Sequence, residues 1–196
     1  MVTGMRQISQ WLIAGVFLLL MSCGAADSSY VWYMDSAEEI RSFGNDGSGA
    51  QFVLYEENAV AGNASMRVIP SGSSGETKVA LPLHGEKLNR WTGHEKVQVR
   101  IYRPENNQLN PEHFFMGMAD ITGGEWSWQG GINGDASELK PGWNEITYTL
   151  TEDMRNLQEG SEYTLFLAFS AYMPPREDGV RVPLYEYFLI DGIKML

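Results

Sequence analysis

Apolar and polar residues alternate along most of the chain beyond residue 29, which is the pattern of strands that bury one face. Val97, Val99 and Ile101 alternate with more polar neighbours until Pro104 ends the run. The same period of two recurs around Ile146. Residues 65–69 and 78–83 are also predicted to form short strands. Glycine-rich and proline-rich segments separate these runs, so the alternation predicts many short strands joined by turns.

Two segments, residues 113–121 and 163–172, are apolar on both faces, which predicts strands in the middle of a sheet or along a sheltered groove. Residues 185–195 predict a last strand. Helix signals are few: residues 36–43, where Ser36 and Glu39 have capping-box spacing, and residues 151–158. The pattern therefore predicts an all-β chain, a two-sheet antiparallel β-sandwich of the jelly-roll type.

The first 22 residues have a different character and predict a signal peptide. An apolar run of eleven residues, 11–21, follows the positive Arg6 and is too short to span a bilayer. The run ends in Leu-Met-Ser-Cys, which resembles a bacterial lipobox and implies cleavage before Cys23 and lipidation of that residue. An ordinary signal peptide followed by a stray Cys is the alternative. We expect residues 23–29 to form a tether, residues 30–196 to form the sandwich, and the protein to be exported and anchored by lipid to the bacterial cell envelope, at the outer membrane or the cell surface.

Composition narrows the candidate functions. The chain has 14 Lys and Arg against 25 Asp and Glu, a net charge of −11, which argues against a nucleic-acid partner. One Cys excludes an internal disulfide, and three His leave little material for a zinc site. We expect a monomer whose membrane contact is the lipid anchor alone.

Five landmarks, in order along the chain, together resemble the β-jelly-roll carbohydrate-binding modules with a galactose-binding-like fold. They are an opening strand that ends in an acid (30–35), a Gly-Asn-Ala-Ser strand start (62–68), a strand closed by Pro104 (97–104), a Pro-Gly-Trp-Asn turn (141–144) and a last strand with an internal acid (188–193). The resemblance implies binding of a polysaccharide or oligosaccharide. It also implies a structural calcium whose ligands, at the matching positions, are Asp35, Glu57, Asn63 and Asp191. An acid inside the apolar run 188–193 also needs a partner on physical grounds, unless Asp191 caps a turn in solvent.

The most distinctive segment for glycan binding is Gly-Gly-Glu-Trp-Ser-Trp-Gln-Gly-Gly at residues 123–131. In a strand, Trp126 and Trp128 project from one face and offer a stacking surface, and the flanking glycines allow close approach. The opposite reading is that both indoles fill the core, because Trp is usually buried. Polar helpers for sugar hydroxyls are expected among Gln129, Asp120, Arg100, Tyr102, Tyr172 and Arg176.

We therefore expect a lipid-anchored, non-catalytic polysaccharide-binding module that stacks sugar rings on surface tryptophans. Two alternatives remain: a small jelly-roll glycoside hydrolase or lyase, and a surface lipoprotein that binds another protein. No catalytic residues are assigned, since no nucleophile, zinc or phosphate motif is present. Exposed Trp rings favour a glycan ligand, buried rings favour protein contact, and two carboxylates about 5–10 Å apart in a cleft favour an enzyme.

Overall fold

The computed structural model describes residues 27–71, 76–105, 113–134, 139–170, 177–178 and 186–196. The proposed signal peptide, Cys23 and the start of the tether lie outside the described residues. The described strands are β1 (Tyr30–Trp32), β2 (Gln51–Tyr55), β3 (Ser65–Ile69), β4 (Thr77–Leu83), β5 (Lys96–Arg103), β6 (His113–Asp120), β7 (Ser127–Asn133), β8 (Gly142–Thr149), β9 (Tyr163–Ser170) and β10 (Phe188–Met195).

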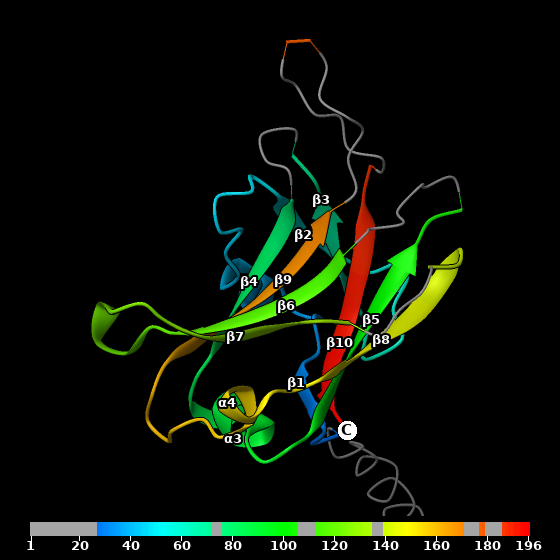
Figure 1. Cartoon of the computed structure of the whole chain (residues 1–196). Helices are drawn as coiled ribbons and strands as arrows, with labels where there is room; N and C mark the ends of the chain where they lie inside the picture. Colours follow the sequence, from blue (N-terminus) through cyan, green and yellow to red (C-terminus); the bar gives the residue numbers. More distant parts are fainter. Residues whose placement is uncertain (1–26, 72–75, 106–112, 135–138, 171–176, 179–185) are drawn as a thin grey trace, which may run out of the picture.

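These strands form two antiparallel sheets, as the sequence predicts (Figure 1). The six-stranded sheet has the order β2-β3-β10-β5-β8, with β1 paired to β10. The four-stranded sheet has the order β4-β9-β6-β7. The all-β, two-sheet sandwich is therefore confirmed.

The core lies between the two sheets and follows the predicted alternation. Along β4 every second residue is buried, beginning at Thr77 and ending at Leu83. On β5 the buried positions are Val97, Val99 and Ile101, so Gln98, Arg100 and Tyr102 point outward from the six-stranded sheet. Because the period is two, one sheet face is fixed to the core and the other is left for solvent or ligand.

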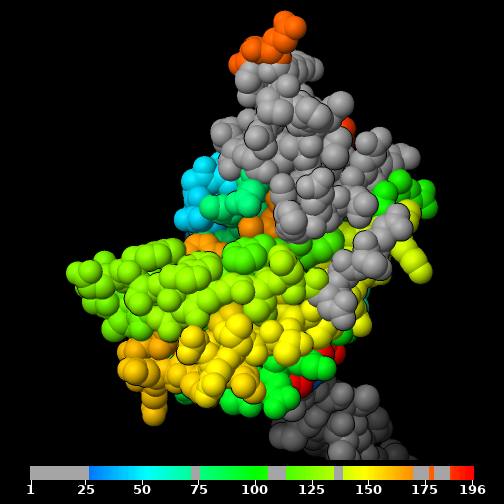
Figure 2. All heavy atoms as spheres, viewed as in Figure 1, coloured from blue at the N-terminus to red at the C-terminus, as the bar shows by residue number. Residues whose placement is uncertain are grey.

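The two segments that are apolar on both faces, β6 and β9, are the middle strands of the four-stranded sheet. Their position confirms the prediction, because a middle strand has neighbours on both edges and its outer face also carries apolar side chains. In Figure 2 the green atoms of β6, β7 and the turn between them run across the surface, so part of this sheet is open to solvent.

Both predicted helices are present but short: α2 (Ala37–Arg41) and α4 (Glu152–Arg155). Ser36 caps α2 as expected, its Oγ accepting a hydrogen bond from the Glu39 backbone N–H at 3.1 Å. A third helix, α3 (Gly85–Trp91), was not predicted, because its seven residues give only two buried positions, Leu88 and Trp91. In Figure 1, α3 and α4 lie together at one end of the sandwich, and the buried Trp91 Nε1 donates to the Met154 carbonyl at 2.8 Å.

Candidate functional site

The outer face of the four-stranded sheet carries aromatic side chains from three strands. Strand register places Ala168 beside Phe115 and Phe166 beside Gly117. It also pairs Gly117 with Gly131 across β6 and β7. Phe115 and Phe166 therefore lie on the same face, in neighbouring rows.

Trp126 and Trp128 complete this surface and are open to solvent. Their exposed fractions are 59% and 52%, whereas Trp32 and Trp91 in the core are fully buried. Trp128 lies in a nearly parallel plane to Phe115, with ring centroids 6.2 Å apart and 3° between planes. Trp126 contacts Phe166 at 5.4 Å between centroids. We call these four rings the aromatic platform; the exposure of both indoles excludes the core-filling alternative.

Two glycines allow the rings to lie against the sheet. A Cβ at Gly117 would lie 2.4 Å from Cη2 of Trp128, and a Cβ at Gly131 would lie 2.3 Å from Cζ of Phe115. Neither distance is sterically allowed, so the rings occupy the space that side chains at these positions would need. The rings of Phe115 and Trp128 therefore pack directly over the paired glycines.

A shallow pocket of about 150 Å³ lies over the platform and has charged groups on one side. Lys78 Nζ is 3.0 Å from Asp46 Oδ2 and 3.8 Å from Glu76 Oε2. We call these three side chains the charged rim. They provide both donors and acceptors beside flat apolar rings, the combination found in sites that bind a ligand with one apolar and one hydroxylated surface.

Of the polar helpers expected from the sequence, Gln129 and Asp120 lie next to the platform in the chain but are used locally. Gln129 occupies the irregularity where β7 shifts register against β6, and its Nε2 donates to the Ser127 carbonyl at 3.4 Å. Asp120 ends β6, and its Oδ1 accepts from the Thr122 N–H at 2.8 Å, which fixes the turn into the 3₁₀ segment Thr122–Gly124.

The structure does not bring Arg100 and Tyr102 to the platform, because both are on the outer face of the other sheet. Arg100 pairs with Glu145, with Nε 3.1 Å from Oε1, and donates to the Tyr30 hydroxyl at 2.7 Å. Tyr102 contacts Trp143 at 5.4 Å between ring centroids. Both residues lie in a strand with the expected alternation, but alternation does not reveal which sheet the strand joins. Tyr172 and Arg176 lie outside the described residues.

Sequence reasoning missed five residues of this surface: Phe115, Phe166, Asp46, Glu76 and Lys78. The two phenylalanines belong to segments that are apolar on both faces, and that pattern was the available signal. The charged rim had no comparable signal, since charged residues in a loop and at a strand start are ordinary on any surface.

A second cluster lies on the other sheet, around Asp191 of β10. The side chain is fully buried, and its Oδ2 accepts the backbone N–H groups of Val60 and Ala61, the latter at 2.7 Å. Its Oδ1 is also buried and has no hydrogen-bond partner among the described residues. Burial raises the pKa of Asp191, the two N–H donors oppose this, and the charge of Asp35 adds to the rise.

The local backbone explains why these carboxylates are close together. The register of β10 against β5 shifts between Ile190 and Ile193, and Gly192 in this irregularity has a φ of 73°. In the β2–β3 loop, Gly62 has a φ of 87°, and a Cβ there would lie 2.7 Å from Asp35 Oδ2. The loop therefore packs closely against Asp35 and covers Asp191.

The other two expected calcium ligands are less engaged. Glu57 is exposed and accepts a hydrogen bond from the Tyr55 hydroxyl at 2.9 Å, and Asn63 is exposed. No group of three or more His, Cys, Asp or Glu side chains with metal-binding geometry occurs in the described part of the chain. A cation at Asp191 would therefore depend on two carboxylates and on backbone oxygens, which calcium accepts. The unpartnered Oδ1 fits such an ion.

The described residues contain no helix long and apolar enough to cross a membrane. No family model and no curated protein matches the sequence.

Solved structures do match in fold. One is described as the structural basis for the promiscuous specificity of carbohydrate-binding modules from the β-sandwich superfamily; it is 18% identical with a TM-score of 0.53, and the match covers 89% of this chain. This chain spans 64% of the length of that one. An arabinose-bound α-L-arabinofuranosidase, MgGH51, matches at 11% identity and a TM-score of 0.50, over 87% of this chain and 26% of the enzyme.

A third match is the C-terminal family 22 carbohydrate-binding module of Clostridium thermocellum Xyn10B, at 13% identity and a TM-score of 0.48, over 87% of this chain and 96% of that module. The first match has the same β-sandwich architecture as the two antiparallel sheets described above. This chain therefore has the β-sandwich fold of the carbohydrate-binding modules, as the order of its sequence landmarks implies.

Proposed function

We propose that the protein binds a polysaccharide on the outer face of its four-stranded sheet. The observation that carries the proposal is the aromatic platform, with Trp126 and Trp128 more than half exposed and Phe115 nearly parallel to Trp128. A pyranose ring has an apolar C–H face that packs on such rings, and burial of apolar area stabilises the contact by about 25 cal/mol per Å². Solved structures of the same fold that are described as carbohydrate-binding modules support the proposal.

The charged rim supplies the polar half of recognition. Lys78 lies between two carboxylates, so the rim presents fixed donors and acceptors to sugar hydroxyls without a large rearrangement on binding. A shallow site of this kind encloses little of its ligand. We expect affinities in the micromolar to millimolar range, about −8 to −4 kcal/mol.

Affinity electrophoresis and calorimetry against xylan, mannan and mixed-linkage β-glucan test the proposal. Trp128→Ala and Phe115→Ala should each weaken binding about tenfold or more, which corresponds to about 1.4 kcal/mol. Tyr102→Ala is the matched control, because it removes a partly exposed aromatic ring from the opposite sheet. If Trp128→Ala and Phe115→Ala bind as well as wild type and Tyr102→Ala loses binding, the ligand lies on the six-stranded sheet and the proposal is overturned.

We also propose a structural calcium between Asp35 and Asp191, completed by oxygens of the β2–β3 loop. The support is the buried Oδ1 of Asp191, which has no donor among the described residues, and the second carboxylate beside it. When bound, the ion would neutralise these charges and fix the loop against β10. The thermal midpoint should rise in millimolar calcium and fall in excess chelator; identical midpoints would contradict the calcium site.

We propose in addition that Cys23 carries the lipid that anchors the protein, on the support of the sequence Leu-Met-Ser-Cys after an apolar run. Wild type expressed in a bacterium that processes lipoproteins should fractionate with membranes. Cys23→Ser should be released in soluble form. A wild-type protein that keeps an unmodified Cys23, by mass spectrometry, would contradict the anchor.

A further inference from the structure

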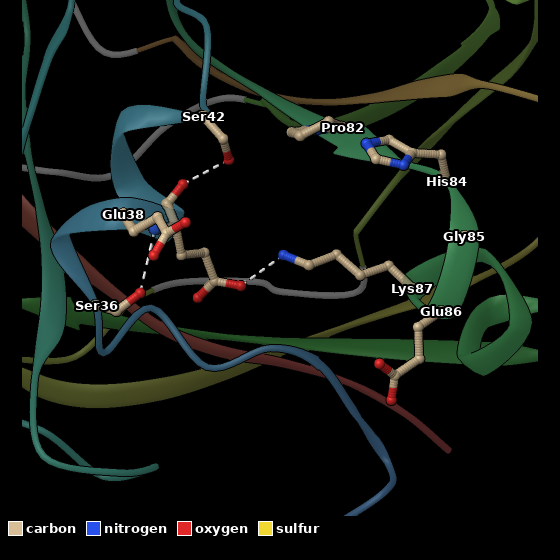
Figure 3. Close-up of a pocket in the computed structure, with 9 residues that line it drawn as sticks. Ser36, Glu38, Ser42, Pro82, His84, Gly85, Glu86 and Lys87 are labelled. Atoms are coloured by element: carbon tan, nitrogen blue, oxygen red, sulfur yellow. Dashed lines mark hydrogen bonds and ion pairs between the residues drawn. The ribbon is translucent and has the colours of Figure 1, made fainter.

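A larger groove lies at β4, an edge strand of the four-stranded sheet, between α2 and the junction of β4 with α3 (Figure 3). Its volume is about 500 Å³. Figure 3 places Ser36 and Ser42 on the α2 side, opposite Pro82, His84 and Lys87 on the other side. We call this the polar groove.

The polar groove and the platform pocket are bordered by the same two segments of chain. Gly44 forms an isolated antiparallel bridge to Ala80 of β4, with N–O distances of 2.9 and 2.7 Å. On one side of the bridge, Asp46 and Lys78 border the platform pocket. On the other side, Ser42 and Pro82 border the polar groove. The alternation of β4 puts Lys78, Ala80 and Pro82 on one face, so both hollows open on the outer face of the sheet.

Two small residues, Gly44 and Ala80, separate the two hollows. Gly44 has no side chain and Ala80 has only a methyl group, and a Cβ at Gly44 would make an ordinary contact of 3.5 Å with that methyl. The four residue-to-residue steps along β4 from Lys78 to Pro82 span about 13 Å. On the outer face of β4 the side chain between Lys78 and Pro82 is therefore the methyl group of Ala80, and the larger side chain beside it, Phe166 of β9, belongs to the aromatic platform.

The polar groove offers groups suited to sugar hydroxyls. Lys87 is fixed by an ion pair with Glu39, whose other oxygen accepts the Met34 N–H at 2.9 Å, so the floor is rigid. His84 precedes α3 as its capping residue but makes no side-chain capping bond, and it is exposed. Its imidazole can donate or accept.

We propose that the polar groove is a distal subsite of the same binding site, which takes further sugar units of a chain that lies on the aromatic platform and crosses Gly44 and Ala80. This inference rests on the proposed function of the platform. It makes the site one for oligosaccharides and polymers, in which units on the platform are held by stacking and units in the groove by hydrogen bonds. Affinity should therefore increase with chain length until the groove is filled.

Calorimetry with the oligosaccharides of the polysaccharide that wild type binds, from disaccharide to hexasaccharide, tests the inference. Affinity should rise about tenfold or more between the shortest and the longest ligand. Ala80→Leu raises the crossing beside Phe166, with which Ala80 pairs in the register of β4 and β9, so it should abolish this gain. Thr147→Leu, on the outer face of the other sheet, is the matched control and should keep the full gain.

His84→Ala should lower affinity for the long ligand only. A length gain that persists in both Ala80→Leu and His84→Ala, with unchanged thermal midpoints, would overturn the distal subsite while leaving the platform intact. Equal affinity of wild type for all lengths would overturn it as well. Failure of the proposed function is a different result: wild type then binds none of the polysaccharides, and Trp128→Ala changes nothing.

Discussion

At the scale of single residues, Gly117 matters because of what it leaves out. A methyl group there would meet both Trp128 and Phe115, at 2.4 and 3.0 Å, so Gly117→Ala should displace the rings. We expect a loss of about 1–3 kcal/mol in the free energy of unfolding and weaker glycan binding. Urea unfolding of Gly117→Ala, Trp128→Ala and the double variant measures the coupling. The cost of the methyl should fall when Trp128 is absent; an equal cost in both backgrounds would show that the ring does not need this glycine.

Tyr148 is a buried residue whose hydroxyl group costs stability. Its ring is fully buried, its hydroxyl has no hydrogen-bond partner among the described residues, and burial raises its pKa. Tyr148→Phe removes an unsatisfied polar group and should raise the free energy of unfolding, by up to about 1–3 kcal/mol.

The raised pKa of Tyr148 favours the protonated form in the folded state. Stability from this source is therefore present below pH about 10 and is lost as the pH rises above it. Chemical unfolding at neutral and alkaline pH should show a smaller alkaline loss in Tyr148→Phe; a variant less stable than wild type at neutral pH would point to a partner for the hydroxyl.

At the scale of elements, the irregularity in β10 and the β2–β3 loop form one unit through Asp191. Asp191→Asn keeps an oxygen that can accept from Val60 and Ala61 but removes the charge. In chelator, the variant should be at least as stable as wild type, since a buried charge with an unpartnered oxygen is costly. Calcium at about 100 times its dissociation constant should stabilise wild type by about 2.7 kcal/mol and the variant far less. Differential scanning calorimetry distinguishes the two proteins, and an undiminished calcium response in Asp191→Asn would place the ion elsewhere.

Also at the scale of elements, the sequence is informative where signals are local and uninformative where strands must be assembled. Trp126 and Trp128 could be chosen as a pair because residues two apart in an extended segment share a face, although Trp126 lies just before the start of β7. Phe115 and Phe166 join them only through the register of β6 with β7 and β9, which no local pattern encodes. Arg100 was chosen for its chemistry, and its strand was predicted correctly, but the strand belongs to the other sheet. The cap at Ser36 was predictable because its partner is three residues away.

At the scale of the whole molecule, net charge should govern which polysaccharides reach the site. The chain carries −11, and the charged rim adds two carboxylates against one ammonium. Stacking of a neutral chain on aromatic rings involves no net charge, so its affinity should change little between low and high ionic strength. A chain of uronic acids would be repelled at a distance and again at the rim, and salt would weaken this repulsion, since the screening length is about 8 Å at physiological ionic strength.

Affinity electrophoresis with a neutral polysaccharide and its uronate-rich counterpart, at two salt concentrations, tests this prediction. The protein should bind the neutral chain more tightly, and the difference in affinity should decrease as salt is added. Asp46→Asn combined with Glu76→Gln should also reduce the difference in affinity between the two chains at low salt. Tight binding of the uronate chain at low salt, lost as salt is added, would mean that local cations such as Lys78 determine selection rather than the overall negative charge.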